Sequence, residues 1–422
     1  MKRRVLWMMS VLLVVGCWSA LAADQDAVTF DDVRPILQEN CTVCHRPAGN
    51  NVMGMVAPMP LRTYQEVRPW AKAVARQVQQ RTMPPWHATS EFAGVFLNER
   101  TLSNEEIATF VDWASSGAAR GESTDDIVEA DSEGSPEWQI GTPDLIVPFE
   151  EAYFVSDDVE DQYATVVVRL TEEQLPEDRW IQGMEFRPGS EAVHHIVIFT
   201  DDKRESLGFP AMAQGMLGGM GPGTDATIFP EGYGRFLRAG STIMFNMHYH
   251  KEPGPGTGVY DHSRIAFKFH DKPVEHAVNW GAVGLMNFSI PPNNSNVELV
   301  AEETFDREIT LMALFPHTHL RGKASRYTAY YPDGSQEVLL DVPNYDFDWQ
   351  TNYIYREPRV LPAGTRLEVR MWYDNSKERG DLTGIDPSRT VGFGQPTTDE
   401  MMLGWIDYTY TGVEAVAGSG GR

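Results

Sequence analysis

Short apolar segments bounded by Gly, Pro, Asn or Asp fill the chain from residue 164 to residue 410, and they constrain the fold most. Each has the length of a β-strand, and turns such as Pro332-Asp333-Gly334 separate them. The segments are Ala164 to Leu170, Ala192 to Thr200, Ser241 to His248, Ile265 to Phe269, Ile309 to Phe315, Arg326 to Tyr331, Val338 to Val342, Leu367 to Tyr373 and Met402 to Tyr410. This spacing predicts β-sandwiches, and a stretch of roughly 280 residues suits two of them.

Within this region, the break between the two sandwiches is expected near Pro291-Pro292-Asn293-Asn294. The Gly/Met-rich segment from Met212 to Gly223 is expected to be a loop. The stretch before it is different, because Gly121 to Ile140 holds seven carboxylates and no basic residue. Such a segment is typical of a solvated linker.

Before that linker the apolar periodicity is helical. An apolar face from Phe30 to Leu37 predicts a first helix, and Tyr64 to Arg81 predicts a second. A third opens with the capping box Ser103-x-x-Glu106 and stops near Gly117.

The N-terminus has the pattern of an export signal. Lys2-Arg3-Arg4 precedes an apolar run from Val5 to Val15, and Ala20-Leu21-Ala22 has the small-residue pattern of a cleavage site. Residues 1–23 are therefore predicted to be a signal peptide of a periplasmic or secreted protein. A competing interpretation places lipid processing at Cys17 and leaves the protein lipid-anchored through that residue.

Cleavage at that site leaves two cysteines, in the sequence Cys41-Thr42-Val43-Cys44-His45. A C-x-x-C-H motif is typical of haem c attachment, with two thioether bonds and the histidine as an iron ligand. A structural zinc site is the alternative, but no further cysteine remains to complete one. Two cysteines also exclude a disulfide framework.

Met83 is the expected sixth ligand of the haem iron, because rigid prolines follow it in Met83-Pro84-Pro85. The stretch resembles the one that carries this ligand in cytochrome c domains. Met53, Met55, Met59 and His87 stay open as alternatives. Three helices around a haem is the plan of a small cytochrome c.

The net charge of −25 excludes nucleic acid as a partner, since phosphate backbones attract positive charge. An acidic surface suits a basic redox partner protein.

Histidine groups in the β region have the spacing of metal ligands. In an extended segment, His317 and His319 point to the same side, so both imidazoles can reach one ion. His194 and His195 are adjacent and diverge in a regular strand, so they share an ion only at a strand start, a bulge or a twist. With His248 they form a set that suits Cu, Zn or Fe.

Four short motifs in order resemble the copper type II ascorbate-dependent monooxygenases, the family of peptidylglycine α-hydroxylating and dopamine β-monooxygenases. The resemblance covers residues from about 140 to 412. The motifs are His194-His195, Met247-His248-Tyr249, His317-Thr318-His319 with Gly322-Lys323, and Asp399-Glu400-Met401. It implies an electron-transfer copper on His194, His195 and His248, and a second copper, binding O₂ and substrate, on His317, His319 and Met401. It also implies ascorbate or another one-electron donor.

Three departures from the family pattern bear on the substrate. The two β domains contain no cysteine, Phe315 replaces an arginine two places before His-Thr-His, and Trp405 replaces a tyrosine four places after the methionine. The missing arginine removes the anchor for a peptide carboxylate. An apolar or aromatic substrate suits Phe315 and Trp405 better.

The predicted fold class is a small all-α cytochrome c domain followed by two all-β, jelly-roll-like sandwich copper domains. The predicted ranges are a signal peptide (1–23), the cytochrome c domain (24–120), an acidic linker (121–140), the two copper domains (141–290 and 291–415) and a flexible tail (416–422).

The predicted function is hydroxylation of a C–H bond of a small organic substrate with O₂, the electrons entering through the haem. The rival is a non-catalytic haem–copper electron carrier or copper-binding protein. A zinc hydrolase is disfavoured, because the histidines show no H-E-x-x-H arrangement.

Overall fold

A computed structural model of the chain describes residues 27–45, 57–122, 138–201 and 215–412. The predicted signal peptide with Cys17, the candidate ligands Met53 and Met55, and the predicted tail lie outside these residues, as does most of the acidic linker. In the part that is described, no helix is both long enough and apolar enough to cross a membrane.

Four helices follow one another before residue 116, and they pack around a small apolar core of their own. They are α1 (Phe30–Asn40), α2 (Tyr64–Val67), α3 (Ala71–Gln79) and α4 (Asn104–Ser115). Phe30, Phe110 and Trp113 are buried at the centre of this core. The predicted capping box is confirmed, because Ser103 N donates to Glu106 Oε2 at 2.7 Å and Glu106 N donates to Ser103 Oγ at 3.2 Å.

Four main sheets, named A to D here, make up most of the molecule. Sheet A has the order β1 (Leu145–Pro148), β11 (Arg264–Phe269), β4 (Arg179–Arg187), β8 (Tyr233–Leu237) and β12 (His276–Ala277), with β7 (Thr227–Ile228) beside β4. Sheet B has the order β3 (Asp161–Arg169), β9 (Thr242–His250), β5 (Val193–Thr200) and β6 (Met216–Met220).

Sheets C and D are built from the later part of the chain. Sheet C has the order β13 (Asn279–Leu285), β20 (Met402–Tyr410), β15 (Ile309–His317) and β18 (Tyr353–Leu361). Sheet D has the order β14 (Val297–Thr304), β19 (Arg366–Tyr373), β16 (Gly322–Tyr330) and β17 (Gln336–Val342). The short strands β2 (Tyr153–Val155) and β10 (Val259–Asp261) pair with each other, and helix α6 (Lys377–Thr383) follows β19.

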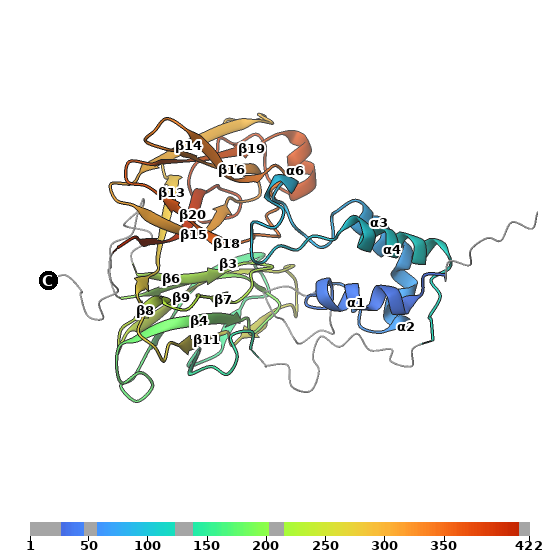
Figure 1. Ribbon diagram of the computed structural model, residues 1–422, viewed down its shortest axis with the longest axis horizontal. Helices are drawn as coiled ribbons and strands as arrows, with labels where there is room; N and C mark the ends of the chain where they lie inside the picture. The colour runs from blue at the N-terminus through green and yellow to red at the C-terminus, as the bar shows by residue number, and fades with distance from the viewer. Residues whose placement is uncertain (1–26, 46–56, 123–137, 202–214, 413–422) are drawn as a thin grey trace, which may run out of the picture.

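The sheets lie in layers, with the helices α1 to α4 to one side of them (Figure 1). One apolar core lies between sheets A and B, and includes Phe267 of β11 and Phe245 of β9. A second lies between sheets C and D, and includes Leu311 of β15 and Val369 of β19. Alternating burial along the strands supplies these cores, as in Val193–Thr200, because successive side chains point to opposite faces.

The predicted fold class is wrong. The structure is a mostly β protein, with 39% strand and 14% helix, and no separate all-α cytochrome c domain is evident among the residues that are described. The segment between α3 and α4, predicted to belong to that domain, packs into the β core instead. Phe92 and Phe96 are buried with Tyr353 and Tyr355 between sheets C and D. Phe96 also forms a β-bridge with Tyr355 of β18.

This misplacement has a physical cause. Helical periodicity locates α3 and α4, but it does not show where the aromatic side chains between them become buried. The short helices offer little apolar surface, whereas the edge of sheet C offers two tyrosine rings. Asn98 fastens the segment there, since its Nδ2 donates to Asn352 O at 2.7 Å and its Oδ1 accepts from Ile354 N at 3.2 Å.

Candidate metal centre

The histidines of the first group, called the histidine trio (His194, His195 and His248), lie on adjacent strands of sheet B. His195 pairs with His248 across β5 and β9, and the register shifts between Val193 and His195. The shift is a β-bulge at His194, which lets adjacent side chains approach one point. The condition set by the sequence, that His194 and His195 share an ion only at an irregularity of the strand, is thus met.

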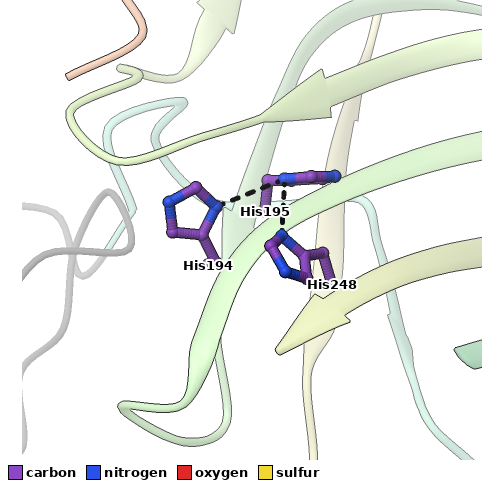
Figure 2. Close-up of side chains that lie close together, drawn as sticks. All are labelled: His194, His195 and His248. Carbon is purple, nitrogen blue, oxygen red and sulfur yellow. Dashed lines mark hydrogen bonds between the residues drawn. The ribbon is translucent and has the colours of Figure 1, made fainter. Parts of the chain in front are cut away.

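The nitrogen atoms of the trio face one another (Figure 2). His195 Nδ1 lies 3.3 Å from His194 Nδ1 and 3.3 Å from His248 Nδ1. Two imidazole nitrogens bound tetrahedrally to one ion at about 2.0–2.1 Å are about 3.3–3.4 Å apart. Potential ligand atoms of all three residues lie within 4.8 Å of one another. The trio is therefore spaced to bind a metal ion.

Asp161 of β3 fixes the orientation of His248. Its Oδ1 is 2.8 Å from His248 Nε2, so a proton on Nε2 is shared with the carboxylate and Nδ1 keeps its lone pair for an ion. The ring of Tyr163 stacks on His248, with centroids 4.4 Å apart. The same carboxylate also contacts the segment before β20, because Asp161 Oδ2 accepts a hydrogen bond from Thr397 Oγ1 at 3.2 Å.

The imidazoles of the trio are held neutral. Burial lowers the pKa of His194 to about 3, with a contribution from neighbouring His248, and burial also lowers the pKa of His195 and His248. Neutral imidazole is the form that binds metals. His194 stacks on Phe347 with centroids 4.7 Å apart, and its Nε2 is buried without a hydrogen-bond partner.

The second group, called the histidine pair (His317 and His319), lies at the end of β15. His317 is the last residue of the strand and His319 follows in the turn, with ring centroids 5.4 Å apart. His317 Nδ1 is 2.7 Å from Gln350 Oε1, and His319 Nδ1 is 3.2 Å from the Asp399 carbonyl oxygen. Both acceptors require a proton on Nδ1, so each ring presents Nε2 as its free lone pair.

Burial also keeps this pair neutral. It lowers the pKa of His317 to about 4 and the pKa of His319 well below its ordinary value. The turn after the pair needs a glycine, because a Cβ atom at Gly322 would collide with the side chain of Thr318. The glycine of the Gly322-Lys323 pair in the sequence motif thus has a steric explanation.

Glu400 joins His319 to Met401. Its carboxylate is fully buried, and Oε2 accepts from His319 N at 2.8 Å and from Met401 N at 3.2 Å. Oε1 accepts from Arg321 N at 2.6 Å. Burial raises the pKa of Glu400 to about 8, against the lowering effect of these donors. The buried carboxyl group thus holds the loop carrying Met401 against the turn carrying His319.

The two histidine groups adjoin across the boundary between sheets B and C. The ring centroids of His195 and His317 are 6.3 Å apart. His195, His317, His319 and Met401 all line one cavity of about 150 Å³. Five histidines and a methionine, from four separate sequence motifs, therefore meet at one place.

The residues predicted to hold haem lie among the helices. Cys41 and Cys44 form no disulfide bond, and both are half-buried. His45 Nδ1 is 3.0 Å from the Met59 carbonyl oxygen, which leaves Nε2 as the free nitrogen. Met83 has 41% of its side chain exposed and lines a separate cavity of about 580 Å³ with Leu102 and Ile107, in which none of the three motif residues takes part.

Several residues of the site were not found from the sequence. Asp161, Tyr163 and Gln350 belong to no motif, and only their pairing across strands or loops brings them to the histidines. The segment predicted to be a loop from Met212 contains β6, whose Met216 and Met220 line the cavity. That prediction is wrong for Met216–Met220, because β6 pairs with β5 as an edge strand whatever its glycine content.

Comparisons with known proteins give no family. No protein-family model matches the chain, and no curated protein matches it. Solved structures similar to it include the major capsid protein P2 of bacteriophage PM2 (8% identity, covering 65% of this chain and 99% of that chain, TM-score 0.26). A second is a broad bean stain virus structure (8% identity, covering 55% of this chain and 76% of that chain, TM-score 0.25). A third is the VP2 subviral particle of infectious bursal disease virus (10% identity, covering 64% of this chain and 72% of that chain, TM-score 0.20). TM-scores this low establish neither a shared fold nor a shared function.

The site itself defines the class. This is a mostly β protein whose His194, His195 and His248 are arranged so that they can bind a metal ion.

Proposed function

We propose that the protein is an exported copper monooxygenase that hydroxylates a C–H bond of a small organic substrate. The balanced reaction is RH + O₂ + 2 e⁻ + 2 H⁺ → ROH + H₂O. The observation that carries the proposal is the lining of one cavity by His195 of the trio together with His317, His319 and Met401. A redox-active site and a place for substrate are thereby adjacent.

The donor sets favour copper. Three neutral imidazoles suit copper, zinc or iron, but a thioether beside two imidazoles selects copper, because soft sulfur stabilises Cu(I). Copper bound by the two groups would supply one-electron redox chemistry and activation of O₂.

The protein's own residues position the donors. Asp161 orients His248, and Gln350 and the Asp399 carbonyl orient the histidine pair, so the free nitrogen of each ring is fixed before an ion arrives. Glu400 fixes the backbone of His319 relative to that of Met401. The largely apolar cavity lining would keep bulk water from the reacting C–H bond.

Electrons would enter through haem c attached to Cys41 and Cys44. The motif, the absence of a disulfide bond between its two cysteines and the available Nε2 of His45 support attachment there. We propose Met83 as the sixth ligand; a basic redox protein would deliver electrons to the haem, whereas ascorbate would reduce the copper ions directly.

Metal analysis with an EPR spectrum tests the metal assignment. We expect two type II copper ions and one haem per chain in the oxidised protein. Zinc in place of copper would contradict the proposal.

A matched pair of substitutions separates the enzyme from the rival electron carrier. In Met401→Leu we expect substrate-dependent O₂ consumption to be lost while the trio keeps its copper. Met286→Leu is the control, because Met286 is 46% exposed at the end of β13 and does not line the cavity. Unchanged redox activity in Met401→Leu would favour the non-catalytic carrier.

The haem route has its own test. Replacing Cys41 and Cys44 by serine should remove covalently bound haem and abolish turnover driven by a reduced redox protein, with turnover driven by ascorbate kept. Unchanged turnover with the protein donor would exclude the haem as entry point.

A further inference from the structure

The cavity beside the histidine pair has an aromatic wall made by neighbouring strands of sheet C. Phe315 of β15 lies opposite Trp405 of β20, and His317 lies opposite Leu403 in the same register. Trp280 of β13 contacts Trp405 edge to face, with ring centroids 5.7 Å apart. Phe315, Trp405 and the proposed ligand His317 thus lie on β15 and β20, and Trp280 lies on the next strand, so a molecule on the wall lies beside His317.

Charge is excluded from this cavity. Among the described residues that line it, none is Asp, Glu, Lys or Arg, and its polar side chains are amides, imidazoles and one phenol. The guanidinium group of Arg235 lies nearby, over the ring of Trp280. It already has hydrogen-bond partners, because its Nη2 donates to Asp407 Oδ1 at 2.7 Å and its Nη1 donates to the Leu217 carbonyl oxygen at 2.7 Å. A charged ligand would therefore lose its water without gaining a protein side chain of opposite charge.

The volume sets the size of the occupant. The cavity holds about 150 Å³. An engineered apolar cavity of about this volume in another protein binds benzene. Resting on the proposed function, we propose that the substrate is a small, uncharged, apolar molecule of about the size of one aromatic ring, held on the wall of Phe315, Trp280 and Trp405.

Binding of toluene, benzoate and benzylamine to the full-length protein, with copper removed by a chelator, tests this without turnover, because a carboxylate or an amine would otherwise bind a copper ion directly. The three probes share one ring and differ in charge. With no reductant present, binding is followed by calorimetry. We expect toluene to bind at least about 100-fold more tightly than either charged probe, because an unpaired buried charge costs several kcal/mol. Equal or tighter binding of a charged probe would overturn the proposal.

A cavity-filling variant locates the binding site. Leu403→Phe should weaken toluene binding by at least about tenfold, because the added ring occupies the space beside the wall. Leu382→Phe is the control, since Leu382 is 82% exposed on α6. Toluene binding that survives Leu403→Phe in a folded protein would place the probe elsewhere and overturn the proposal.

The two proposals fail separately. Binding is measured without electrons or turnover, so absence of O₂ consumption would contradict only the proposed function. Conversely, a copper monooxygenase that binds charged probes better than toluene would contradict only the substrate class.

Discussion

The histidine trio and the histidine pair offer the same side chain in opposite arrangements. The trio lies within the hydrogen-bonded strands β5 and β9, and its Nδ1 atoms converge. The pair lies where β15 ends, and both of its Nδ1 atoms are turned away to Gln350 and Asp399. The trio brings three imidazoles together, whereas the pair shares the lining of its cavity with the side chain of Met401.

This difference shows how position in a sheet sets the character of a site. Strand pairing fixes the trio on both sides, so its ligands need only one carboxylate behind them, Asp161. The pair has no partner strand at His319, so a buried glutamate and a glutamine must position it. Both rings of the pair line the cavity.

The largest effect is expected from removing an imidazole of the trio. His248→Ala should lower metal affinity at the trio by more than about 100-fold, beyond what loss of a supporting residue costs. Metal per chain after dialysis against a chelator measures it, and His262→Ala, at an exposed position, is the control. Full metal retention in His248→Ala would show that the pair, not the trio, holds the tighter ion.

Glu400→Gln should act on the pair and leave the trio unchanged. Glutamine has one acceptor oxygen, so its NH₂ group would face a backbone N–H of His319 or Arg321. We expect a loss of about 1–3 kcal/mol in the free energy of unfolding, because a buried backbone N–H would be left without an acceptor. Denaturant unfolding measures it.

Glu357→Gln, at an exposed position, is the control for that experiment. A wild-type stability of Glu400→Gln would mean that the glutamate does not fasten the turn to the loop.

Asp161→Asn is expected to have a smaller effect, confined to the trio. The amide oxygen can still accept from His248 Nε2, but without the charge, so metal affinity should fall by about tenfold. Metal titration followed by EPR separates the trio from the pair. The control is Asp306→Asn, since Asp306 has 81% of its side chain exposed. An equal loss at both groups would show that the link from Asp161 to Thr397 couples them.

The smallest effect is expected where the segment before α4 joins the β sheets. Arg100 donates to both carboxylate oxygens of Asp225 at 2.6 Å, with side chains 18% and 24% exposed. Arg100→Ala should cost about 1 kcal/mol of unfolding free energy and leave metal binding unchanged. Thermal unfolding with metal analysis tests this. Loss of metal would mean that the segment supports the site through the loop that contains Asp225.

The sequence predicted individual elements better than their assembly. Each of the nine segments predicted as strands overlaps an observed strand, and the capping box at Ser103 is confirmed. Other observed strands were not predicted, among them β4, β14 and β18, and β6 was assigned to a loop because a Gly-rich edge strand has no apolar alternation to detect. The fold class failed because the burial of Phe92 and Phe96 against Tyr353 and Tyr355 joins positions roughly 260 residues apart, which no local pattern records.

For the site, the sequence by itself determined which side chains are able to bind metal. His194, His195, His248, His317 and His319 were singled out as candidates by residue type and spacing, whereas Met401 was added only by the resemblance to a known family. Only the tertiary structure decided that the two groups adjoin, with His195 and His317 6.3 Å apart, and that Asp161, Gln350 and Glu400 orient them. The physical reason is that ligand chemistry belongs to single side chains, whereas orientation and distance depend on strand register and on buried hydrogen bonds between remote segments.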